Sequence, residues 1–225
     1  MPEAPLRLNS VLLSLIRHGE SEGNVAATLQ GCRIDPPLTE RGRRQASALA
    51  ARLAGHPVDG IVVSPLMRAR ETAAPIAVAR GLLPVEDAGL MEFDWGEWTG
   101  RRLDEALELD LKSLRSRWRA GEIDLALAGG ESPRAAALRC AGVLERVRAL
   151  GYGSVVLVGH GRVNRILMTV LMGRDVSRMD EVKQRNAGLS VFEWNGGPAT
   201  PLLLDDIAHL EPELRSRVFG DSSLR

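Results

Sequence analysis

Cysteine is scarce in this sequence, and long apolar runs are absent. Its only two cysteines, Cys32 and Cys140, lie far apart and form no CxxC motif. This pattern excludes a disulfide framework and a cysteine-based zinc site, and it fits a reducing compartment. The longest uncharged apolar stretches have six to eight residues, which is too short to span a bilayer. Because the first ten residues also lack the features of a secretory signal, we expect a cytoplasmic protein with no membrane association.

The chain also lacks an excess of charge of either sign. It has 29 basic and 29 acidic residues, so its formal net charge is zero. A general nucleic-acid-binding protein normally carries a basic excess, and we therefore expect no nucleic-acid partner. Lysine is nearly absent, since all basic residues except Lys112 and Lys183 are arginines. A GC-rich genome would account for most of these arginines, which leaves open whether a few of them have a specific role.

The composition is otherwise that of an ordinary globular protein. Hydrophobic residues make up 44% of the chain and charged residues 26%, which argues against intrinsic disorder. A chain of 225 residues buries enough apolar surface to fold without a disulfide or a structural metal. Since no repeat, linker or shift in composition divides the sequence, we expect residues 1–225 to form a single domain.

Apolar runs alternate with amphipathic segments, which is typical of α/β proteins. Strands are predicted at Val11–Ile16, Val58–Val63, Leu83–Glu86, Ser154–Val158, Leu189–Trp194 and Pro201–Ile207. Helices are predicted at 39–53, 64–80, 103–118, 132–150 and 163–171, with Thr39, Ser64 and Ser132 as N-caps. This order predicts a three-layer αβα sandwich with a mostly parallel central sheet and helices on both faces. Residues 92–131 would form a small helical cap inserted into it, and the polar tail after Pro212 would be loosely held.

Two of the four histidines follow buried strands in the same way. The first strand runs into Arg17-His18-Gly19, and the fourth runs into Gly159-His160-Gly161. In open α/β sheets the ligand crevice lies outside the carboxyl ends of the strands. A single histidine at such a position is more often structural, but two in equivalent positions favour a catalytic site.

Arginine completes a pattern that suits a phosphoryl group. Arg68 lies in the first turn of the helix after the second strand, where free N–H groups favour an anion. This segment alone is equally consistent with a surface arginine. Arg17, His18, Arg68 and His160 together would match a dianionic phosphoryl group, and a neutral imidazole can attack phosphorus to form a phosphohistidine. No cluster of acidic residues points to a metal site, so we expect neither a metal nor another cofactor.

An ordered series of short segments runs through most of the chain. From Leu13 to about Trp194 it consists of LIRHGES, GN, DPPLTERGRRQA, SPLMRARETA, LMEFDWGEWTG, GGES and VVLVGHGRV. A single RHG tripeptide would be weak evidence, but the whole series in this order is highly specific. It resembles the histidine phosphatase superfamily, in the branch that includes cofactor-dependent phosphoglycerate mutases and many small phosphatases.

The resemblance implies a role for each of the four residues already singled out. His18 would be the phosphoacceptor. Arg17 and Arg68 would clamp the phosphate, and His160 would be the second histidine, which stabilises the transferring group.

The resemblance also implies roles for residues that the strand ends alone do not identify. Glu92 would be the proton donor to the leaving group, although outside this context it would be interpreted as a solvated loop carboxylate. Asn24 would contact the phosphate or the substrate, and Asn186 would support the site. Gly19 and Gly161 would let the backbone approach the phosphate closely.

Phosphatases and mutases of this family share the phosphohistidine and differ in the acceptor, which is water or a substrate hydroxyl. The resemblance implies that mutases have a longer segment after the catalytic glutamate, with basic or tyrosine residues beside it. Here Phe93-Asp94-Trp95-Gly96 follows Glu92, and only about 40 residues separate Glu92 from Gly130-Glu131-Ser132. We therefore expect a phosphomonoesterase that acts on a small phosphorylated metabolite, with a mutase-type transfer as the alternative.

Two readings from other classes remain as competitors. Gly159–Asn164 half resembles the GxGxxG motif of dinucleotide-binding proteins, but Asn164 replaces the third glycine. A non-catalytic module that binds a phospho-ligand would normally have lost a catalytic histidine or a clamp arginine, and this chain keeps all four.

An exposed edge strand could also pair in a homodimer.

The predicted cap is rich in tryptophan and arginine. It holds Trp95, Trp98 and Trp118 together with Arg101, Arg102, Arg115, Arg117 and Arg119. These side chains either pack the cap on the core with an exposed basic face, or they select the organic part of the substrate.

Overall fold

A six-stranded sheet forms the centre of the molecule, of which a computed structural model describes residues 10–215. The strands are β1 (Val11–Arg17), β2 (Gly60–Val63), β3 (Val85–Glu86), β4 (Ser154–Gly159), β5 (Leu189–Trp194) and β6 (Thr200–Asp206). They lie in the order β3-β2-β4-β1-β5-β6. Neighbouring strands from β3 to β1 in this order are parallel to each other. Strand β5 is antiparallel to β1, and β6 is antiparallel to β5. The prediction of a mostly parallel central sheet is therefore confirmed.

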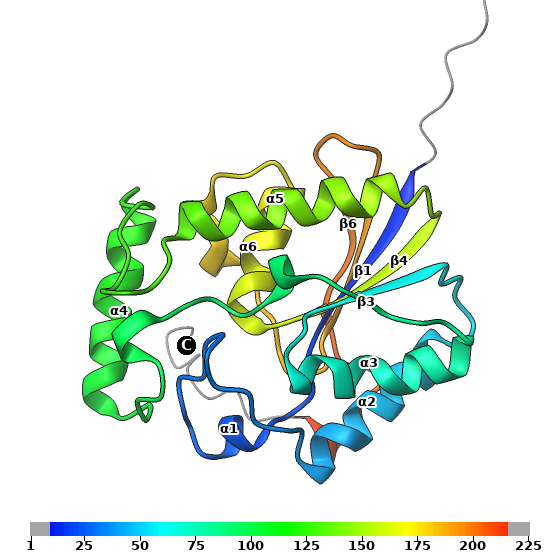
Figure 1. Cartoon of the computed structure of the whole chain (residues 1–225), viewed down its shortest axis with the longest axis horizontal. Helices are drawn as coiled ribbons and strands as arrows, with labels where there is room; N and C mark the ends of the chain where they lie inside the picture. Colours follow the sequence, from blue (N-terminus) through cyan, green and yellow to red (C-terminus); the bar gives the residue numbers. More distant parts are fainter. Residues whose placement is uncertain (1–9, 216–225) are drawn as a thin grey trace, which may run out of the picture.

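Helices cover both faces of this sheet (Figure 1). They are α1 (Glu22–Val25), α2 (Glu40–Leu53), α3 (Met67–Arg80), α4 (Glu105–Arg119), α5 (Pro133–Ala149) and α6 (Gly161–Leu171). Short 3₁₀ helices lie at η1 (Ala88–Leu90), η2 (Gly96–Trp98), η3 (Val176–Glu181) and η4 (Pro212–Leu214). Helices α2 and α3 pack on one face and α5 and α6 on the other. The predicted αβα sandwich is therefore confirmed.

The central strands show why their sequences are continuously apolar. In β4, Val155 and Leu157 belong to the core under α5 and α6, whereas Val156 and Val158 belong to the core under α2 and α3. All four side chains are almost completely buried. A strand covered on both faces has no solvent side, so its sequence does not alternate between apolar and polar residues.

Two of the three predicted N-caps are confirmed. The Thr39 side chain accepts a hydrogen bond from the Gly42 N–H, and the Ser132 side chain accepts one from the Ala135 N–H. The prediction for Ser64 is wrong, since α3 begins three residues later, at Met67. The Ser64 N–H still donates to the Val158 carbonyl at 3.0 Å. The chain is thus still paired with the sheet at Ser64 and cannot begin the helix there.

Other boundaries move by a few residues. Strands β2 and β3 each begin two residues later than predicted, and α6 begins two residues earlier, at Gly161. The tail after Pro212 does not start loosely, because Leu214 is buried and its carbonyl accepts a hydrogen bond from Gln45 Nε2 at 2.6 Å. The remainder of that tail, residues 216–225, lies outside the described residues.

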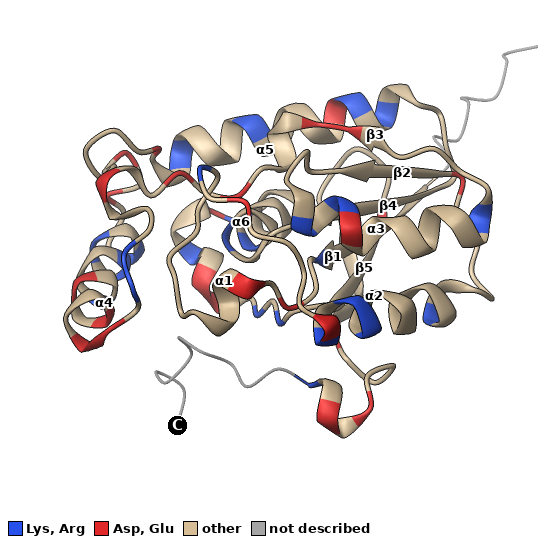
Figure 2. Ribbon diagram, turned by 60° about the horizontal axis from the view of Figure 1, so that its bottom comes forward, with Lys and Arg blue, Asp and Glu red and all other residues tan. Residues whose placement is uncertain are grey.

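Helix α4 stands beyond one end of the sheet and carries both acidic and basic side chains (Figure 2). Leu107, Leu111, Leu114 and Trp118 form its buried stripe. Trp118 meets the rings of Phe93 and Trp95, with centroids 5.6 and 6.1 Å apart. These contacts join α4 to the main core. Within residues 10–215, no helix is both long and apolar enough to cross a membrane.

Candidate active site

The carboxyl ends of β1 and β4 and the start of α3 border one large cleft, of about 1720 Å³. Most of the predicted site residues line it, namely Arg17, His18, Asn24, Arg68, Glu92 and Gly161, together with Asn186. His160 does not line the cleft. It is completely buried, and its ring centroid lies 5.1 Å from that of His18. The topology thus brings together residues that are more than 140 positions apart in the sequence.

The surroundings of His18 define which of its nitrogens can react. His18 Nδ1 lies 2.7 Å from the Gly19 carbonyl oxygen, which can only accept a hydrogen bond. Nδ1 therefore carries the proton, and the neutral ring keeps a lone pair on Nε2. Burial, followed by the charges of Arg68 and Arg17, holds the pKa of His18 well below its usual value. At neutral pH the ring is therefore uncharged, with a lone pair on Nε2.

His160 is held between Arg68 and a serine. Arg68 Nε donates to His160 Nδ1 at 3.2 Å, so the neutral His160 carries its proton on Nε2. Nε2 then donates to Ser64 Oγ at 2.8 Å. Burial and the neighbouring charge of Arg68 hold the pKa of His160 well below its usual value. Both histidines are thus neutral and close together.

Arg17 is a partly buried cation whose donors are incompletely used. Its Nη1 donates to the Gln184 carbonyl at 2.7 Å, whereas its buried Nε has no partner among residues 10–215. Burial lowers the pKa of Arg17 to about 10, so the group stays charged at neutral pH. A cation with a buried, unpaired donor is costly unless an anion compensates it. The cleft beside Arg17 is the place where such an anion would bind.

Arg68 is anchored more completely than Arg17. It is 1% exposed, and its Nη1 and Nη2 donate to the carbonyls of Ile34 and Gly31, each at 2.9 Å. Asp35 lies 3.4 Å from Nη1 and partly balances the charge. Burial lowers the pKa of Arg68. This arginine therefore ties the 31–35 loop to His160 and has few donors left for a ligand.

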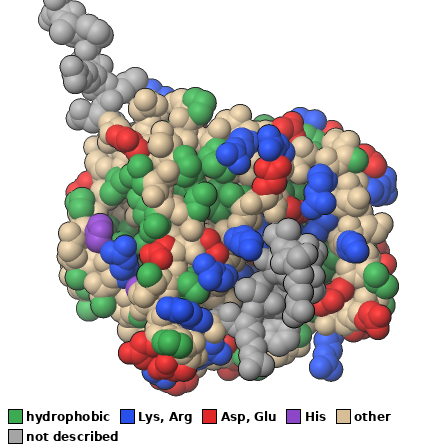
Figure 3. Space-filling model, turned by 180° about the vertical axis from the view of Figure 1, so that it is seen from behind, with side chains coloured by type: hydrophobic (Ala, Val, Ile, Leu, Met, Phe, Trp, Pro, Cys, Tyr) green, Lys and Arg blue, Asp and Glu red, His purple; other side chains and the backbone are tan. Residues whose placement is uncertain are grey.

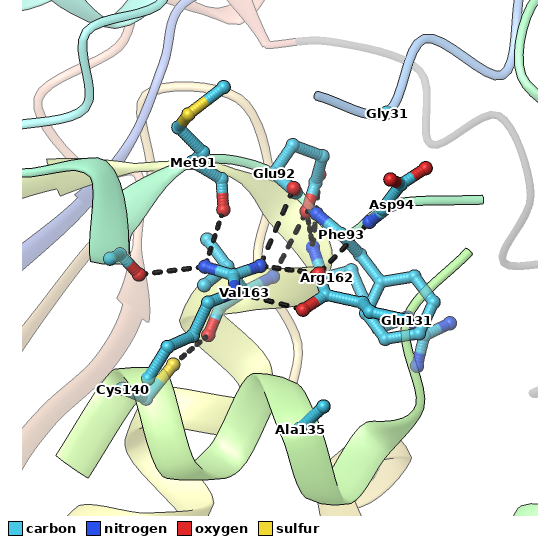
Figure 4. Close-up of polar contacts among 12 residues, drawn as sticks. Gly31, Met91, Glu92, Phe93, Asp94, Glu131, Ala135, Cys140, Arg162 and Val163 are labelled. Carbon is cyan, nitrogen blue, oxygen red and sulfur yellow. Dashed lines mark hydrogen bonds and ion pairs between the residues drawn. The ribbon is translucent and has the colours of Figure 1, made fainter. Parts of the chain in front are cut away.

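Glu92 lies at the N-terminus of α6 (Figure 4). Its Oε1 accepts hydrogen bonds from the backbone N–H groups of Arg162 and Val163, at 3.2 and 3.0 Å. Its Oε2 lies 3.2 Å from the N–H of Arg162. The free N–H groups of a helix N-terminus are natural partners of a carboxylate. The notion that Glu92 is merely a solvated loop carboxylate is therefore wrong, since this group is held in place beside the cleft.

Asn24 and Asn186 support the loop that follows His18. Asn186 Nδ2 donates to the His18 carbonyl at 3.1 Å and to Asn24 Oδ1 at 3.2 Å. Asn24 Oδ1 also accepts the Ser21 N–H at 3.0 Å, so only its Nδ2 remains for a ligand. Gly161 lies beside Arg17, and a Cβ at this position would come within 3.3 Å of the Arg17 Cζ. Glycine here gives the guanidinium its place next to the helix N-terminus.

Comparison with known protein families identifies the family to which this fold belongs. The model of the histidine phosphatase superfamily, branch 1, matches residues 13–207. The chain belongs to this superfamily. The resemblance found in the sequence, and the expectation of a histidine phosphatase, are confirmed.

Relatives of this histidine phosphatase include proteins named as phosphatases and proteins named as mutases. Phosphoserine phosphatase 1 of Hydrogenobacter thermophilus is 35% identical over 201 residues, which cover 89% of this chain and 94% of the relative. A probable phosphoglycerate mutase of Photorhabdus laumondii is 33% identical and covers 88% of this chain and 94% of the relative. A solved phosphoserine phosphatase of Entamoeba histolytica, in complex with 3-phosphoglyceric acid, superposes with a TM-score of 0.77. It is 27% identical, and the match covers 89% of this chain and all of that one.

Gly19 has a different role in this histidine phosphatase from the one expected. Its N–H donates to Thr72 Oγ1 at 3.0 Å, so it is not available to a phosphate. A Cβ at Gly19 would lie 2.6 Å from the Gly42 carbonyl oxygen. Glycine is required there because the loop after His18 packs directly against the first turn of α2.

The cap contributes to the cleft with some of its basic residues. Arg115 and Arg119 line the cleft, whereas Arg101 and Arg117 form ion pairs with Asp110 and Glu122. The tryptophans follow the simpler expectation more closely, because Trp95 and Trp118 are 5% and 1% exposed. The interpretation that the tryptophans pack the cap on the core is confirmed, whereas selection of the substrate by cap residues stays a prediction. The tryptophans of the cap pack on the core, while two of its arginines face the cleft.

Sequence reasoning missed Arg162, which links the cap to α6. It is nearly buried, it pairs with Asp180, and its Cζ lies 5.7 and 5.8 Å from the rings of Trp95 and Trp118. The sequence holds 27 arginines, and nothing in the local pattern separates this one from the others. Its contacts come from the cap and from η3, which are distant in the sequence.

Proposed function

We propose that this histidine phosphatase hydrolyses a small phosphorylated metabolite through a phosphohistidine on His18. The carrying observation is the hydrogen bond of 2.7 Å from His18 Nδ1 to the Gly19 carbonyl, which leaves Nε2 unprotonated beside Arg17. A neutral imidazole nitrogen in a cationic pocket combines a nucleophile with electrostatic stabilisation of a phosphoryl group.

The first step is phosphoryl transfer to the enzyme. His18 Nε2 forms a bond to phosphorus while the ester P–O bond breaks, and the leaving oxygen takes a proton from the Glu92 carboxyl group. Arg17 and the remaining donor of Arg68 hold the phosphoryl oxygens. His160, whose ring centroid lies 5.1 Å from that of His18, is assigned to stabilise the charge that develops, with its Nε2–H passing from Ser64 Oγ to a phosphoryl oxygen. Asn24, through its free Nδ2, and the backbone of Gly161 complete the phosphate site.

The second step returns the enzyme to its starting state. Water attacks the phosphohistidine, the P–N bond breaks, and the Glu92 carboxylate takes a proton from the water. Inorganic phosphate leaves, and His18 is again neutral. This cycle needs no metal, and among residues 10–215 no group of three or more His, Cys, Asp or Glu side chains is arranged to hold one.

The test is to trap the intermediate. After incubation with a phosphate-labelled substrate and a rapid quench, label stable to alkali and labile to acid should be found on His18. His18→Ala should lose turnover and label while its circular dichroism spectrum stays unchanged. Label on a serine would overturn the nucleophile, and a strong loss of activity in EDTA would overturn the metal-free cycle. A wild type without turnover would instead support a non-catalytic binding module.

A mutase-type transfer is the second candidate, favoured by the 33% identity to a probable phosphoglycerate mutase. The two activities differ only in the acceptor of the phosphoryl group. An assay with 3-phosphoglycerate as the substrate, run with and without 2,3-bisphosphoglycerate, distinguishes the two activities. We expect release of inorganic phosphate, whereas formation of 2-phosphoglycerate without net phosphate release would favour the mutase.

We further propose that the chain forms one domain, with residues 92–131 as its cap. We also propose that it is located in the cytoplasm and that it forms a homodimer. The free cysteines Cys32 and Cys140 support the location, which cell fractionation tests. Edge strand β6 leaves Leu202 and Leu204 56% and 47% exposed, and the back of the molecule carries a group of hydrophobic side chains (Figure 3). A monomer in analytical ultracentrifugation would contradict the dimer.

A further inference from the structure

The segment that carries Glu92 has no strand or helix of its own. Residues 91–95 follow η1 as an irregular connection into the cap. Backbone carbonyls in such a segment need donors from elsewhere if the segment is to keep one conformation. For the carbonyls of Gly89, Met91 and Glu92 the donors come from a single side chain on α5. Arg139 Nη1 donates to the carbonyls of Gly89 and Met91 at 2.7 and 2.8 Å, and Nη2 lies 3.4 Å from the carbonyl oxygen of Glu92.

The same guanidinium also binds a carboxylate. Arg139 Nε donates to Glu131 Oε2 at 2.9 Å, and Nη2 donates to Glu131 Oε1 at 2.6 Å. All five N–H groups of Arg139 thus have acceptors. Glu131 Oε1 in turn accepts the N–H of Asp94 at 2.9 Å. The Arg139–Glu131 pair therefore holds the backbone on both sides of Glu92.

Glu92 is consequently held at two places. Its backbone is fixed by Arg139 and Glu131, and its carboxylate is fixed by the first N–H groups of α6 (Figure 4). Arg139 and Glu131 do not themselves line the cleft. They cannot touch a substrate there, so they act on the reaction from behind Glu92, by holding its backbone and by their charges.

We propose that the Arg139–Glu131 pair is a positioning device that aims the Glu92 carboxyl group at the leaving oxygen. This inference rests on the proposed role of Glu92 as the proton donor. Lysine cannot replace Arg139, because an ammonium group has three donors and cannot bind a carboxylate and three carbonyls in one plane. A misplacement of about 1 Å in such a group costs about 10²-fold in rate.

The experiment compares two substrates that differ in their need for a proton. The phenolate leaving group of phenyl phosphate is a strong base and must be protonated, whereas 2,4-dinitrophenolate leaves as a stable anion. The quantity measured is the ratio of kcat/KM for phenyl phosphate to kcat/KM for 2,4-dinitrophenyl phosphate. This ratio covers only the steps up to departure of the leaving group. It is independent of the folded fraction of the sample, so a partly unfolded variant still gives a valid result.

Two variants test the pair, and two serve as references. Arg139→Lys and Glu131→Gln each weaken the device. Glu92→Gln removes the donor itself and should lower the ratio by about 10²-fold or more. Arg146→Lys is the matched control, since Arg146 lies seven residues further along α5 and pairs with Asp87 at 2.7 and 2.8 Å.

We expect Arg139→Lys and Glu131→Gln to lower the ratio by about tenfold or more, while Arg146→Lys leaves it unchanged. Suppose that Glu92→Gln lowers the ratio. If the two variants then lose kcat/KM equally on both substrates, or lose none, the positioning role is overturned. If Glu92→Gln itself leaves the ratio unchanged, the donor assignment is wrong and the inference is overturned with it. The two failures are thus distinguishable.

Discussion

At the scale of single residues, burial decides the protonation of the two histidines of the candidate site. His18 and His160 are 3% and 0% exposed and lie beside two arginines. Ionisation of either ring would place another positive charge in the same desolvated pocket. The pocket therefore contains two charged guanidinium groups and two neutral imidazoles. This distribution suits a dianionic ligand, because the cations attract the phosphate while the nucleophile keeps its lone pair.

The two histidines should make stability depend on pH. An unfolded histidine titrates near pH 6.5, whereas the buried rings titrate well below it. Below pH 6.5 the unfolded state therefore binds protons that the native state does not bind. The stabilisation is complete above pH 6.5, and it is lost as the pH falls toward the depressed pKa values, by about 1.4 kcal/mol per pH unit for each ring.

Urea denaturation at pH 7.5, 6.5 and 5.5 measures this loss. His18→Asn removes one of the two groups and should make the free energy of unfolding less dependent on pH. His56→Asn, at an exposed histidine, is the control and should keep the dependence of the wild type. An equally steep dependence in His18→Asn would contradict the assignment.

At the scale of elements, the contact between the loop after His18 and α2 fixes the position of that loop. A Cβ at Gly42, in the first turn of α2, would lie 2.0 Å from the Glu20 carbonyl oxygen. The Glu20 carbonyl also accepts the Thr39 N–H at 2.9 Å, so the loop and the helix start are bonded as well as packed. Helix α2 can thus approach the loop only because residues 19 and 42 are both glycines.

Gly42→Ala should therefore lower both stability and activity. Alanine favours the helix by about 0.5–1 kcal/mol, but overpacking costs about 1–3 kcal/mol and moves the loop that follows His18. The matched control is Gly55→Ala just beyond the other end of α2, where an added Cβ would meet nothing within 4 Å. Thermal unfolding and kcat/KM are measured for both. A Gly42→Ala protein as stable and active as the wild type would show that the contact is not required.

At the scale of the whole molecule, electrical neutrality conceals an uneven distribution of charge. The formal net charge is zero, yet twelve Arg and Lys side chains line the cleft together with only seven Asp and Glu side chains. Both lysines of the chain are among them. A concave site with an excess of one sign attracts ligands of the other sign. The abundance of arginine thus has a specific consequence at the cleft, where it attracts anions, and no identified function elsewhere.

Inorganic phosphate should stabilise the folded protein by binding in this cleft. At a phosphate concentration of 100 Kd the gain is about 2.7 kcal/mol, which raises Tm by about 5–10 °C in a protein of this size. Thermal unfolding in phosphate and in chloride at equal ionic strength measures the shift. Arg17→Gln should lose most of it, because the unpaired Nε of Arg17 is the donor that the anion would satisfy. A shift of equal size in Arg17→Gln would place the anion elsewhere.

The sequence by itself determined the fold class and the candidate residues of the site. The apolar runs of β1 and β4 end at Arg17-His18 and His160, and the carboxyl ends of parallel strands share one edge of a sheet. The segments with Arg68 and Glu92 were recognisable because their signal lies in neighbouring residues. Element boundaries were less certain, as the start of α3 at Met67 rather than at Ser64 demonstrates.

Only the tertiary structure decided what holds these residues in place. Ser64 contacts His160, 96 positions away, and Arg139 contacts the carbonyls of residues 89, 91 and 92, 47 to 50 positions away. A local pattern contains no information on such pairs, because their distance depends on how separate helices and strands pack. The groups that react can be read from short motifs, whereas the groups that orient them are defined only when the chain is folded.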